Sequence, residues 1–287
     1  MGVTRALIEN PDKLSKANLV RLIPRAVIGL IALLCGNAYI VGINQIYDVQ
    51  IDEINKPFLP IAAKLMTKDQ AWKLIMLCLF TGMGIVKTQF SSQIFALYSL
   101  GVILGTSYSV PPLQLKRKAF FAGSIIAIVR GFLLNFGVYY AVREALEIPF
   151  KWNPIVGFLS TFMTVFATVI AITKDLPDVE GDKKYAIETF ATKYGVKSVA
   201  RLSSAILSLA YIAAIATPFS TRTGGAAFNR LPMVGGHSLF LAYFLWSYNK
   251  FDKANRGSEE TDAASLKRFY KSIWNIFYAE YCLYPFI

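Results

Sequence analysis

Two groups of polar residues have the types and the spacing that metal-assisted chemistry on a phosphorylated substrate requires. The first group, with a spacing of four residues, is Asn44, Asp48 and Asp52. The second group, with intervals of three and four residues, is Asp175, Asp178 and Asp182. Such intervals place side chains on one face of a helix. Carboxylate oxygens are the hard ligands that Mg²⁺ prefers, together with water and phosphate oxygens. The five aspartates are therefore predicted Mg²⁺ ligands, and Asn44 is a predicted substrate-binding residue.

A structural alternative is open for each acidic group. Carboxylates near a helix C-terminus oppose the helix dipole, at about 0.3 to 1 kcal/mol each, and they also repel one another. They could be solvated helix ends that pair with Lys56, Lys174 or Lys183. Two groups with similar spacing, at helix ends on the same membrane side, favour the metal site over this alternative.

A basic segment follows one of the apolar runs. Residues 108–118 read YSVPPLQLKRK, in which Pro111 and Pro112 end a helix. Lys116 and Arg117 are placed to hold the oxygens of a diphosphate as it leaves. The alternative is that these cations only anchor the end of a membrane span on the basic side.

Arg130 lies in the middle of the apolar run 119–142. An ionised side chain at that depth needs a polar cavity or a partner. The position indicates a role in the site, with a structural pair to a carboxylate or a backbone carbonyl as the alternative. Asn135 and Tyr139 follow on roughly the same helix side, and Asn135 is a second candidate for substrate binding. Lys174, next to the second acidic group, is a third.

The elements that must position these residues are membrane-spanning helices. The 287 residues are 55% hydrophobic and 17% charged, and the mean hydropathy is +0.45. Stretches nearly free of charge occupy 26–47, 74–86, 88–110, 119–142, 152–173, 202–220, 231–249 and 269–287. Most are long enough to cross a bilayer as helices, whereas barrel strands would need alternating segments of about 10 residues. The sequence predicts an all-α, multi-span transmembrane helical bundle of about eight spans, forming one domain over residues 1–287.

The placement of charge points to a membrane and not to nucleic acid. The formal net charge is +12. If all the runs cross, most Lys and Arg residues gather in loops on one side, namely 48–73, 111–118, 174–201 and 250–268. By the positive-inside rule this side faces the compartment of synthesis. Basic loops of this kind attract phosphorylated substrates and anionic lipid headgroups, so the lipid bilayer is the predicted macromolecular partner.

The cysteines and the single histidine predict no site. Cys35, Cys78 and Cys282 lie in apolar runs without metal-ligand spacing, and they are interpreted as buried hydrophobic residues. His237 follows two glycines in another apolar run, where no second ligand is visible. Neither a metal site nor the role of a general base is assigned to it.

Five segments resemble the plastid homogentisate prenyltransferases, a branch of the UbiA family of membrane prenyltransferases. They are GINQIYDVQIDEINKPFLPIAA (42–63), YSVPPLQLKR (108–117), RGFLLNFGVYY (130–140), ITKDLPDVEGD (172–182) and SIWNIFYAEYCLYPFI (272–287). The glutamine at position 45 and the KDLPDVEGD form are similar to the plant branch. Within that branch, 130–140 and the tail most resemble the solanesyl-transferring members, with the phytyl-transferring members of tocopherol synthesis as the alternative.

The resemblance implies a nine-helix bundle with a lateral opening for the lipid donor and a polar cap. It makes the two acidic groups the ligands of Mg²⁺ and diphosphate, and it places Tyr108, Lys116 and Arg117 in the cap, as catalytic residues with Arg130. The implied reaction joins a long polyprenyl diphosphate to homogentisate with loss of CO₂, in a plastid membrane, for plastoquinone biosynthesis. A catalytically impaired relative that binds prenyl lipid stays open.

Departures and competing classes complete the prediction. Members of the family begin with a further helix that carries an Arg-Pro-His-Thr type motif, whereas Thr4–Asn10 resembles the end of that helix. The first helix is therefore expected to be truncated or absent. A multi-pass carrier would place its charged clusters near the membrane midplane, but these acids lie at span ends. A CDP-alcohol phosphatidyltransferase would need an Asp-Gly string followed by Ala-Arg, which does not occur.

Overall fold

The computed structural model describes residues 16–150, 152, 154–184, 188–220, 227–258 and 261–287. Over these residues the protein is helical and forms no strand, which confirms the predicted all-α class. The predicted helix end at Thr4–Asn10 lies outside the described residues. The chain divides into two compact units. Of the described residues, the α2–α4 unit holds those of 16–125 and Phe136–Phe150, and the α7–α12 unit holds Ile126–Asn135 and those of 152–287.

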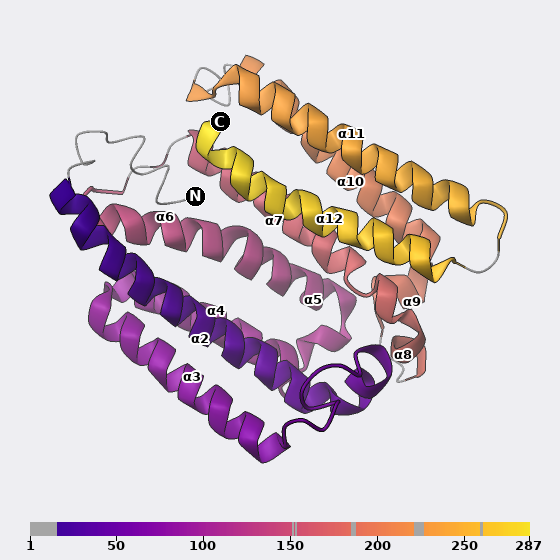
Figure 1. Ribbon diagram of the computed structural model, residues 1–287, viewed down its shortest axis with the longest axis horizontal. Coiled ribbons are helices and arrows are strands. Elements are labelled where there is room, and N and C mark those ends of the chain that lie inside the picture. Colours follow the sequence, from indigo (N-terminus) through magenta and orange to yellow (C-terminus); the bar gives the residue numbers. More distant parts are fainter. Residues whose placement is uncertain (1–15, 151, 153, 185–187, 221–226, 259–260) are drawn as a thin grey trace. The chain divides into compact units, whose positions relative to one another are not determined.

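Three long helices form the α2–α4 unit and lie side by side in Figure 1. They are α2 (Lys16–Asn55), α3 (Lys68–Gln89) and α4 (Ser92–Ser109). The start of α3 is fixed by a capping box, in which the Thr67 side chain accepts a hydrogen bond from the Gln70 amide and the Gln70 side chain accepts one from the Thr67 amide. Apolar side chains of α2 and α3, including Ile43 and Ile75, form the core between them.

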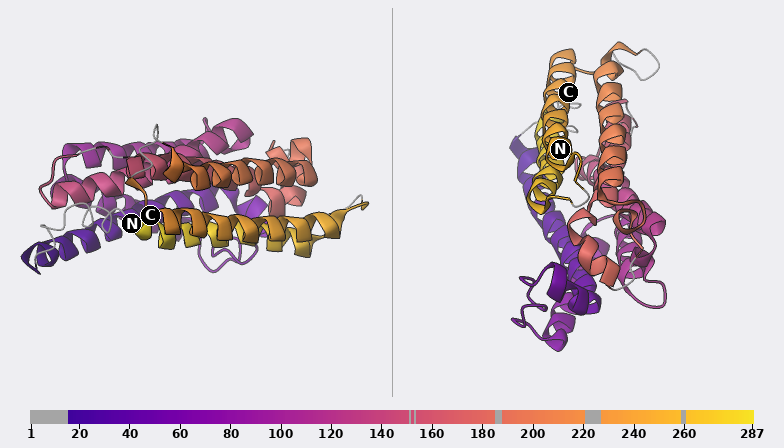
Figure 2. Two further views of the ribbon diagram at one scale, coloured as in Figure 1. Left: turned by 90° about the horizontal axis from the view of Figure 1, so that it is seen from above. Right: turned by 90° about the vertical axis from the view of Figure 1, so that its right-hand side faces the viewer.

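Four long helices form the α7–α12 unit. They are α7 (Pro154–Thr173), α10 (Val196–Ala216), α11 (Arg230–Asn255) and α12 (Ala263–Leu283). Their axes follow one common direction in Figures 1 and 2. The core between them is rich in aromatic rings, and Phe166, Phe244 and Phe269 are almost fully buried in it.

Shorter elements join these helices. They are η2 (Leu115–Arg117), α5 (Ala119–Ile126), η3 (Ala127–Leu133), α6 (Leu134–Ala145), η4 (Leu176–Asp178), α8 (Val179–Lys184), α9 (Phe190–Tyr194), η5 (Thr217–Phe219) and η7 (Tyr284–Phe286). Together α5, η3 and α6 form one continuous helical segment, which contributes residues to both units.

Each of the eight predicted apolar runs is largely helical over its described residues, and the run 88–110 is divided between the end of α3 and α4. Among the described residues, five helices are long and apolar enough to cross a membrane, namely Leu22–Asn55, Lys68–Gln89, Ala119–Ala145, Pro154–Asp178 and Val196–Phe219. The helices α4, α11 and α12 are outside this group, and their crossing stays a prediction. Large apolar side chains are exposed on these helices, for example Leu77 and Leu209. A bilayer would cover such a surface, which identifies an integral membrane protein.

A buried polar cluster connects three helices of the α7–α12 unit. The Tyr211 hydroxyl on α10 donates to Glu280 Oε1 on α12 at 2.8 Å. On α11, His237 Nδ1 donates to the Met233 carbonyl at 2.6 Å, and His237 Nε2 lies 3.5 Å from Glu280 Oε2. All three side chains are fully buried. His237 is therefore part of the packing between α10, α11 and α12.

Removing the Glu280 carboxylate is expected to destabilise the α7–α12 unit. Glu280→Ala leaves the Tyr211 hydroxyl buried without its acceptor, at a cost of about 1 to 3 kcal/mol. Glu280→Gln keeps an acceptor for Tyr211 and is expected to cost less. The measurement is thermal unfolding in detergent, with Glu188→Ala as the control because Glu188 is exposed. Equal unfolding temperatures for Glu280→Ala and the parent would contradict this role.

Candidate active site

The first acidic group lies on the last turns of α2. Because α2 continues unbroken to Asn55, Asn44, Asp48 and Asp52 share one helix face, as their spacing predicts. Asp52 is buried and the Asp48 side chain is 14% exposed. Lys116 Nζ lies 2.5 Å from Asp48 Oδ1 and donates to Asn44 Oδ1 at 3.1 Å. Two oxygen ligands of this face thus converge on one cation.

Ser109 is a member of this cluster that the sequence analysis missed. Its hydroxyl, fully buried at the end of α4, donates to Asn44 Oδ1 at 3.0 Å. Asn44 Oδ1 therefore accepts two hydrogen bonds, one from Ser109 and one from Lys116. These two bonds fix the orientation of the Asn44 amide, with its oxygen toward Ser109 and Lys116. The only sequence signal for Ser109 was its place next to Tyr108 in the segment before the two prolines.

In the basic segment after α4, the two cations predicted for the site lie in different environments. Lys116 and Arg117 lie on the single turn η2, yet the Lys116 side chain is 12% exposed against Asp48 whereas Arg117 is exposed. Tyr108 is half-buried on the last turn of α4. Of the two cations, Lys116 contacts the first acidic group, among the residues that the structure describes. The roles predicted for Arg117 and Tyr108 stay predictions.

The second acidic group does not continue the helix of its span, in contrast to the expected single helix face. The helix α7 ends at Thr173, Asp175 precedes η4, Asp178 ends η4, and Asp182 lies buried in α8. Pro177 explains the break, because it lacks the amide that would bond back to the preceding turn and it disfavours a helical conformation at the residue before it. Lys174 forms an ion pair with Asp175.

The donor chemistry of both groups fits Mg²⁺. In each group an ammonium already lies against a carboxylate, Lys116 at Asp48 and Lys174 at Asp175, so each group binds a cation through oxygen. No three side chains of His, Cys, Asp or Glu are close enough to hold a metal ion, within the ranges that the structure describes. A metal ion here would therefore complete its coordination with water and substrate phosphate oxygens, as Mg²⁺ commonly does.

Arg130 lies in a π-helical segment, η3, which the sequence did not predict. Turns of this type occur frequently at functional sites. Gly131 brings this segment against α7, since a Cβ atom there would lie 2.5 Å from Thr164 Cα. The Asn135 amide donates to the carbonyls of Gly131 at 2.7 Å and Arg130 at 3.3 Å. Asn135 thus satisfies backbone groups of the π-turn, and its predicted contact with substrate stays a prediction.

The Arg130 guanidinium contacts an aromatic ring. Its Cζ atom lies 5.1 Å from the centre of the Trp274 ring on α12, which is within range for a cation–π interaction. Within the described part of the chain, this guanidinium forms no hydrogen bond and no ion pair. The structural alternative considered for Arg130, a pair with a carboxylate or a carbonyl, therefore has no support among these residues. The guanidinium retains its full capacity to bind an anion.

Arg143 shows what a structurally satisfied arginine looks like in this protein. It is buried near the end of α6, and it donates to the Pro149 carbonyl through Nε at 3.0 Å and Nη2 at 2.8 Å. Its Nη1 atom donates to the Tyr139 hydroxyl at 2.9 Å. Tyr139, expected on the side of Arg130, is thus engaged by Arg143. Arg130 has no comparable partners among the described residues.

Known proteins with similar sequences and folds identify the family. The sequence model of the UbiA prenyltransferase family matches residues 15–273. The rice protein named probable homogentisate phytyltransferase 2, chloroplastic, is 50% identical over 99% of this chain and 72% of its own length. The homogentisate solanesyltransferase, chloroplastic, of Arabidopsis thaliana is 48% identical over 99% of this chain and 71% of its own length.

A solved structure has the same fold. The UbiA homolog from Archaeoglobus fulgidus bound to GPP and Mg²⁺ superposes with a TM-score of 0.58 at 18% identity, covering 91% of this chain and 87% of that one. The family match extends over most of the chain, and it includes both acidic groups and the basic segment between them. This protein belongs to the UbiA prenyltransferase family.

Proposed function

We propose that this protein transfers a prenyl group from a prenyl diphosphate to homogentisate. The observation that carries the proposal is the cluster of Asn44, Asp48 and Lys116, in which two oxygen ligands and an ammonium meet at the end of a membrane helix. Support comes from two relatives that are about half identical over nearly the whole chain and are both named homogentisate prenyltransferases. Their names also support a chloroplast membrane as the location.

The proposed donor is a long polyprenyl diphosphate of the solanesyl type. The resemblance of residues 130–140 and of the tail to the solanesyl-transferring members favours this donor. A phytyl donor is the alternative, because relatives of either name have nearly equal identity to this chain, 50% and 48%. The overall reaction forms a carbon–carbon bond between the prenyl C1 and the ring, and it releases diphosphate and, from the acetate group, CO₂.

The residues proposed to hold Mg²⁺ are the aspartates of the two groups, namely Asp48, Asp52, Asp175, Asp178 and Asp182. When bound, Mg²⁺ supplies positive charge that offsets the charge of the leaving diphosphate. Lys116 is placed to contribute a second positive charge, because its ammonium lies between Asn44 and Asp48. Ser109 keeps the oxygen of Asn44 directed at that point. Positive charge fixed in place before the reaction stabilises the departing group without reorganisation.

The carbon chemistry requires an acceptor ring held in place and a site without water. Breakage of the C1–O bond leaves an allylic cation, which the electron-rich ring attacks before it loses its proton. Arg130 is proposed to orient an anionic group of a substrate, either the acetate carboxylate of the acceptor or the diphosphate. Water excluded from the site cannot capture the cation.

The test is an assay of the purified protein with homogentisate and a panel of labelled donors, geranylgeranyl, phytyl and solanesyl diphosphate. We expect one CO₂ released for each prenylated product and the highest kcat/KM with solanesyl diphosphate. 4-Hydroxybenzoate as acceptor provides the control and is expected to give no product. Absence of product with every donor would reject homogentisate transfer, and a preference for the phytyl donor would select the alternative.

A further inference from the structure

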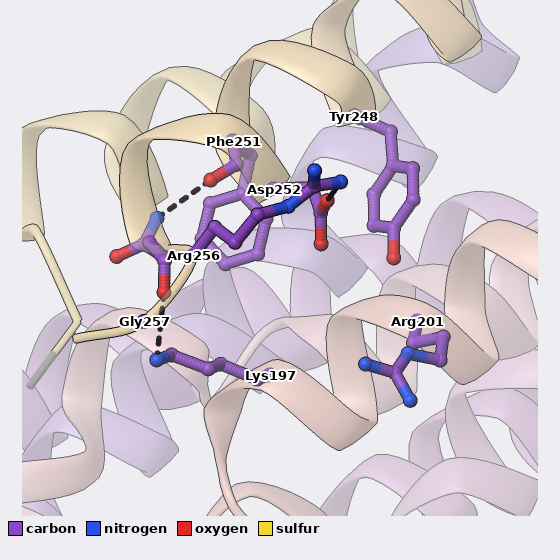
Figure 3. A pocket seen from close by; sticks show the side chains of 8 residues that line it. Lys197, Arg201, Tyr248, Phe251, Asp252, Arg256 and Gly257 are labelled. Atoms are coloured by element: carbon purple, nitrogen blue, oxygen red, sulfur yellow. Dashed lines mark hydrogen bonds and ion pairs between the residues drawn. The ribbon is translucent and has the colours of Figure 1, made fainter. Parts of the chain in front are cut away.

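A basic cavity lies where α10 begins and α11 ends, and no residue of either acidic group lines it. Its volume is about 320 Å³, and Lys197 and Arg201 of α10 line it together with Tyr248 and Asp252 of α11 and with Arg256, which follows α11. In Figure 3, Arg201 extends from α10 beneath the side chains that α11 contributes. All of these residues belong to the α7–α12 unit.

The charges in this cavity leave one cation available for an anion. Lys197 Nζ donates to the Asn255 carbonyl at 2.9 Å, and Arg256 pairs with Asp252 at 3.1 Å. In the described part of the chain, Arg201 forms neither an ion pair nor a hydrogen bond. Three cationic side chains face one carboxylate, so the formal charge of the lining is positive. Such a lining favours binding of an anion.

An apolar surface continues from the cavity along both helices. On α10, Arg201 is followed at helical intervals by Ala205, Leu209 and Ile212, and Leu209 is 66% exposed and Ile212 54% exposed. On α11, Leu245 precedes Tyr248 by one turn and is 45% exposed. A ligand whose anionic group occupied the cavity would therefore have an exposed apolar stripe next to it on the two helices.

Near the cavity, α11 has residues that are typical of a membrane interface. Lys250 Nζ lies 3.8 Å from the centre of the Trp246 ring, and Trp246 is exposed. Tryptophan and lysine are typical of the boundary between headgroups and hydrocarbon. The cavity lies within two turns of this pair, so its basic lining is at headgroup level when the apolar stripe is in hydrocarbon.

We propose that this cavity binds the anionic headgroup of a membrane lipid, through its phosphate or sulfonate oxygens, while the acyl chains lie along the stripe of Leu209, Ile212 and Leu245. Arg201 is the principal contact, and its fork of donors suits such oxygens. Basic pockets between membrane helices bind anionic headgroups in this way. The proposal is independent of the proposed function, since no residue of the cavity belongs to either acidic group.

The test measures lipid binding to the intact protein in detergent by native mass spectrometry, with phosphatidylglycerol and phosphatidylcholine. We expect phosphatidylglycerol to bind more tightly, and Arg201→Gln to weaken it about fivefold, the effect of one cation near a headgroup. Asp252→Asn is expected to tighten it, because the substitution removes the competing carboxylate from Arg256. Lys253→Gln is the matched control, since Lys253 is exposed on the same turns of α11 and does not line the cavity.

Three results would overturn the proposal. Equal affinity of the parent for the two lipids would exclude recognition of an anionic headgroup. An unchanged affinity for phosphatidylglycerol in Arg201→Gln, or an equal loss of affinity in Lys253→Gln, would show that binding depends on general surface charge and not on the cavity. Inorganic phosphate that displaces phosphatidylglycerol at the same concentration would show that the chains contribute nothing, so that the cavity would be a simple anion site.

Discussion

Replacing Asp48 or Asp178 by Asn is expected to reduce prenyl transfer about 1,000-fold, which corresponds to about 4 kcal/mol of transition-state stabilisation. Asn retains one oxygen but removes the negative charge that holds a divalent cation and, through it, the diphosphate. At Asp48 the substitution also removes the partner of Lys116. The measurement is kcat/KM for the donor over a range of Mg²⁺ concentrations, together with the effect of EDTA on the parent, which is expected to abolish turnover.

Two conservative substitutions provide matched controls. Glu53 lies on α2 one residue after Asp52 and is exposed, so Glu53→Gln changes the charge of the same helix end off the acidic face. Glu188 is exposed in the α7–α12 unit and pairs with Lys193 at 3.0 Å. Both Glu→Gln variants are expected to retain parental turnover. Activity of Asp48→Asn or Asp178→Asn within about threefold of the parent at saturating Mg²⁺ would remove these residues from the metal site.

The position of the first acidic group on one helix face could be predicted from the sequence, because regular helix geometry was enough to do so. Four-residue spacing places Asn44, Asp48 and Asp52 on one face of any continuous helix, and α2 is continuous there. The sequence predicted that the basic segment contributes a cation to the site, but it did not predict the contact of Lys116 with this helix face. The basic segment indicated a phosphate-binding role, but which of its two cations turns inward depends on the turn η2, and short turns have weak sequence signals.

Local exceptions to regular helix geometry account for most of what the sequence did not predict. The π-helical turn at Arg130 depends on tertiary contacts, since Gly131 lies against Thr164 of α7. The break after Thr173 does have a signal in Pro177, but the regular spacing of the aspartates favours a continuous helix and so conflicts with it. The helical state of the apolar runs, in contrast, follows from composition, because backbone groups in lipid must be satisfied within the helix. Their boundaries do not, since α2 extends over Lys16–Asn55 and thus well beyond the run 26–47.

Buried polar pairs were beyond sequence reasoning for a different reason. Glu280 lies in the apolar run 269–287, and His237 lies in the run 231–249. Nothing in either run identifies the other as its partner. Only the packing of α11 against α12 brings the two side chains together. The cavity at Arg201 likewise depends on which faces of α10 and α11 meet.

Replacing Arg130 is expected to produce the second large loss of activity. Arg130→Gln should lower kcat/KM about 100-fold, in the range found when a single donor to a developing anion is removed. Arg130→Lys should lower it about tenfold, because lysine keeps the charge but cannot bind an anion with two parallel donors. The present contacts support this expectation, since in the described part of the chain the guanidinium lies over the Trp274 ring and forms no hydrogen bond and no ion pair.

Steady-state kinetics with each substrate varied in turn will show which anion Arg130 binds. A higher KM for homogentisate with an unchanged donor KM would assign the acetate carboxylate, whereas a lower kcat with a higher donor KM would assign the diphosphate. Arg230→Lys is the matched control, because Arg230 also lies over a ring, that of Phe219, but is exposed at the start of α11. Because Lys retains the cation–π contact, a structural role for Arg130 predicts unchanged kinetics in Arg130→Lys for both substrates, and that result would exclude Arg130 from substrate binding.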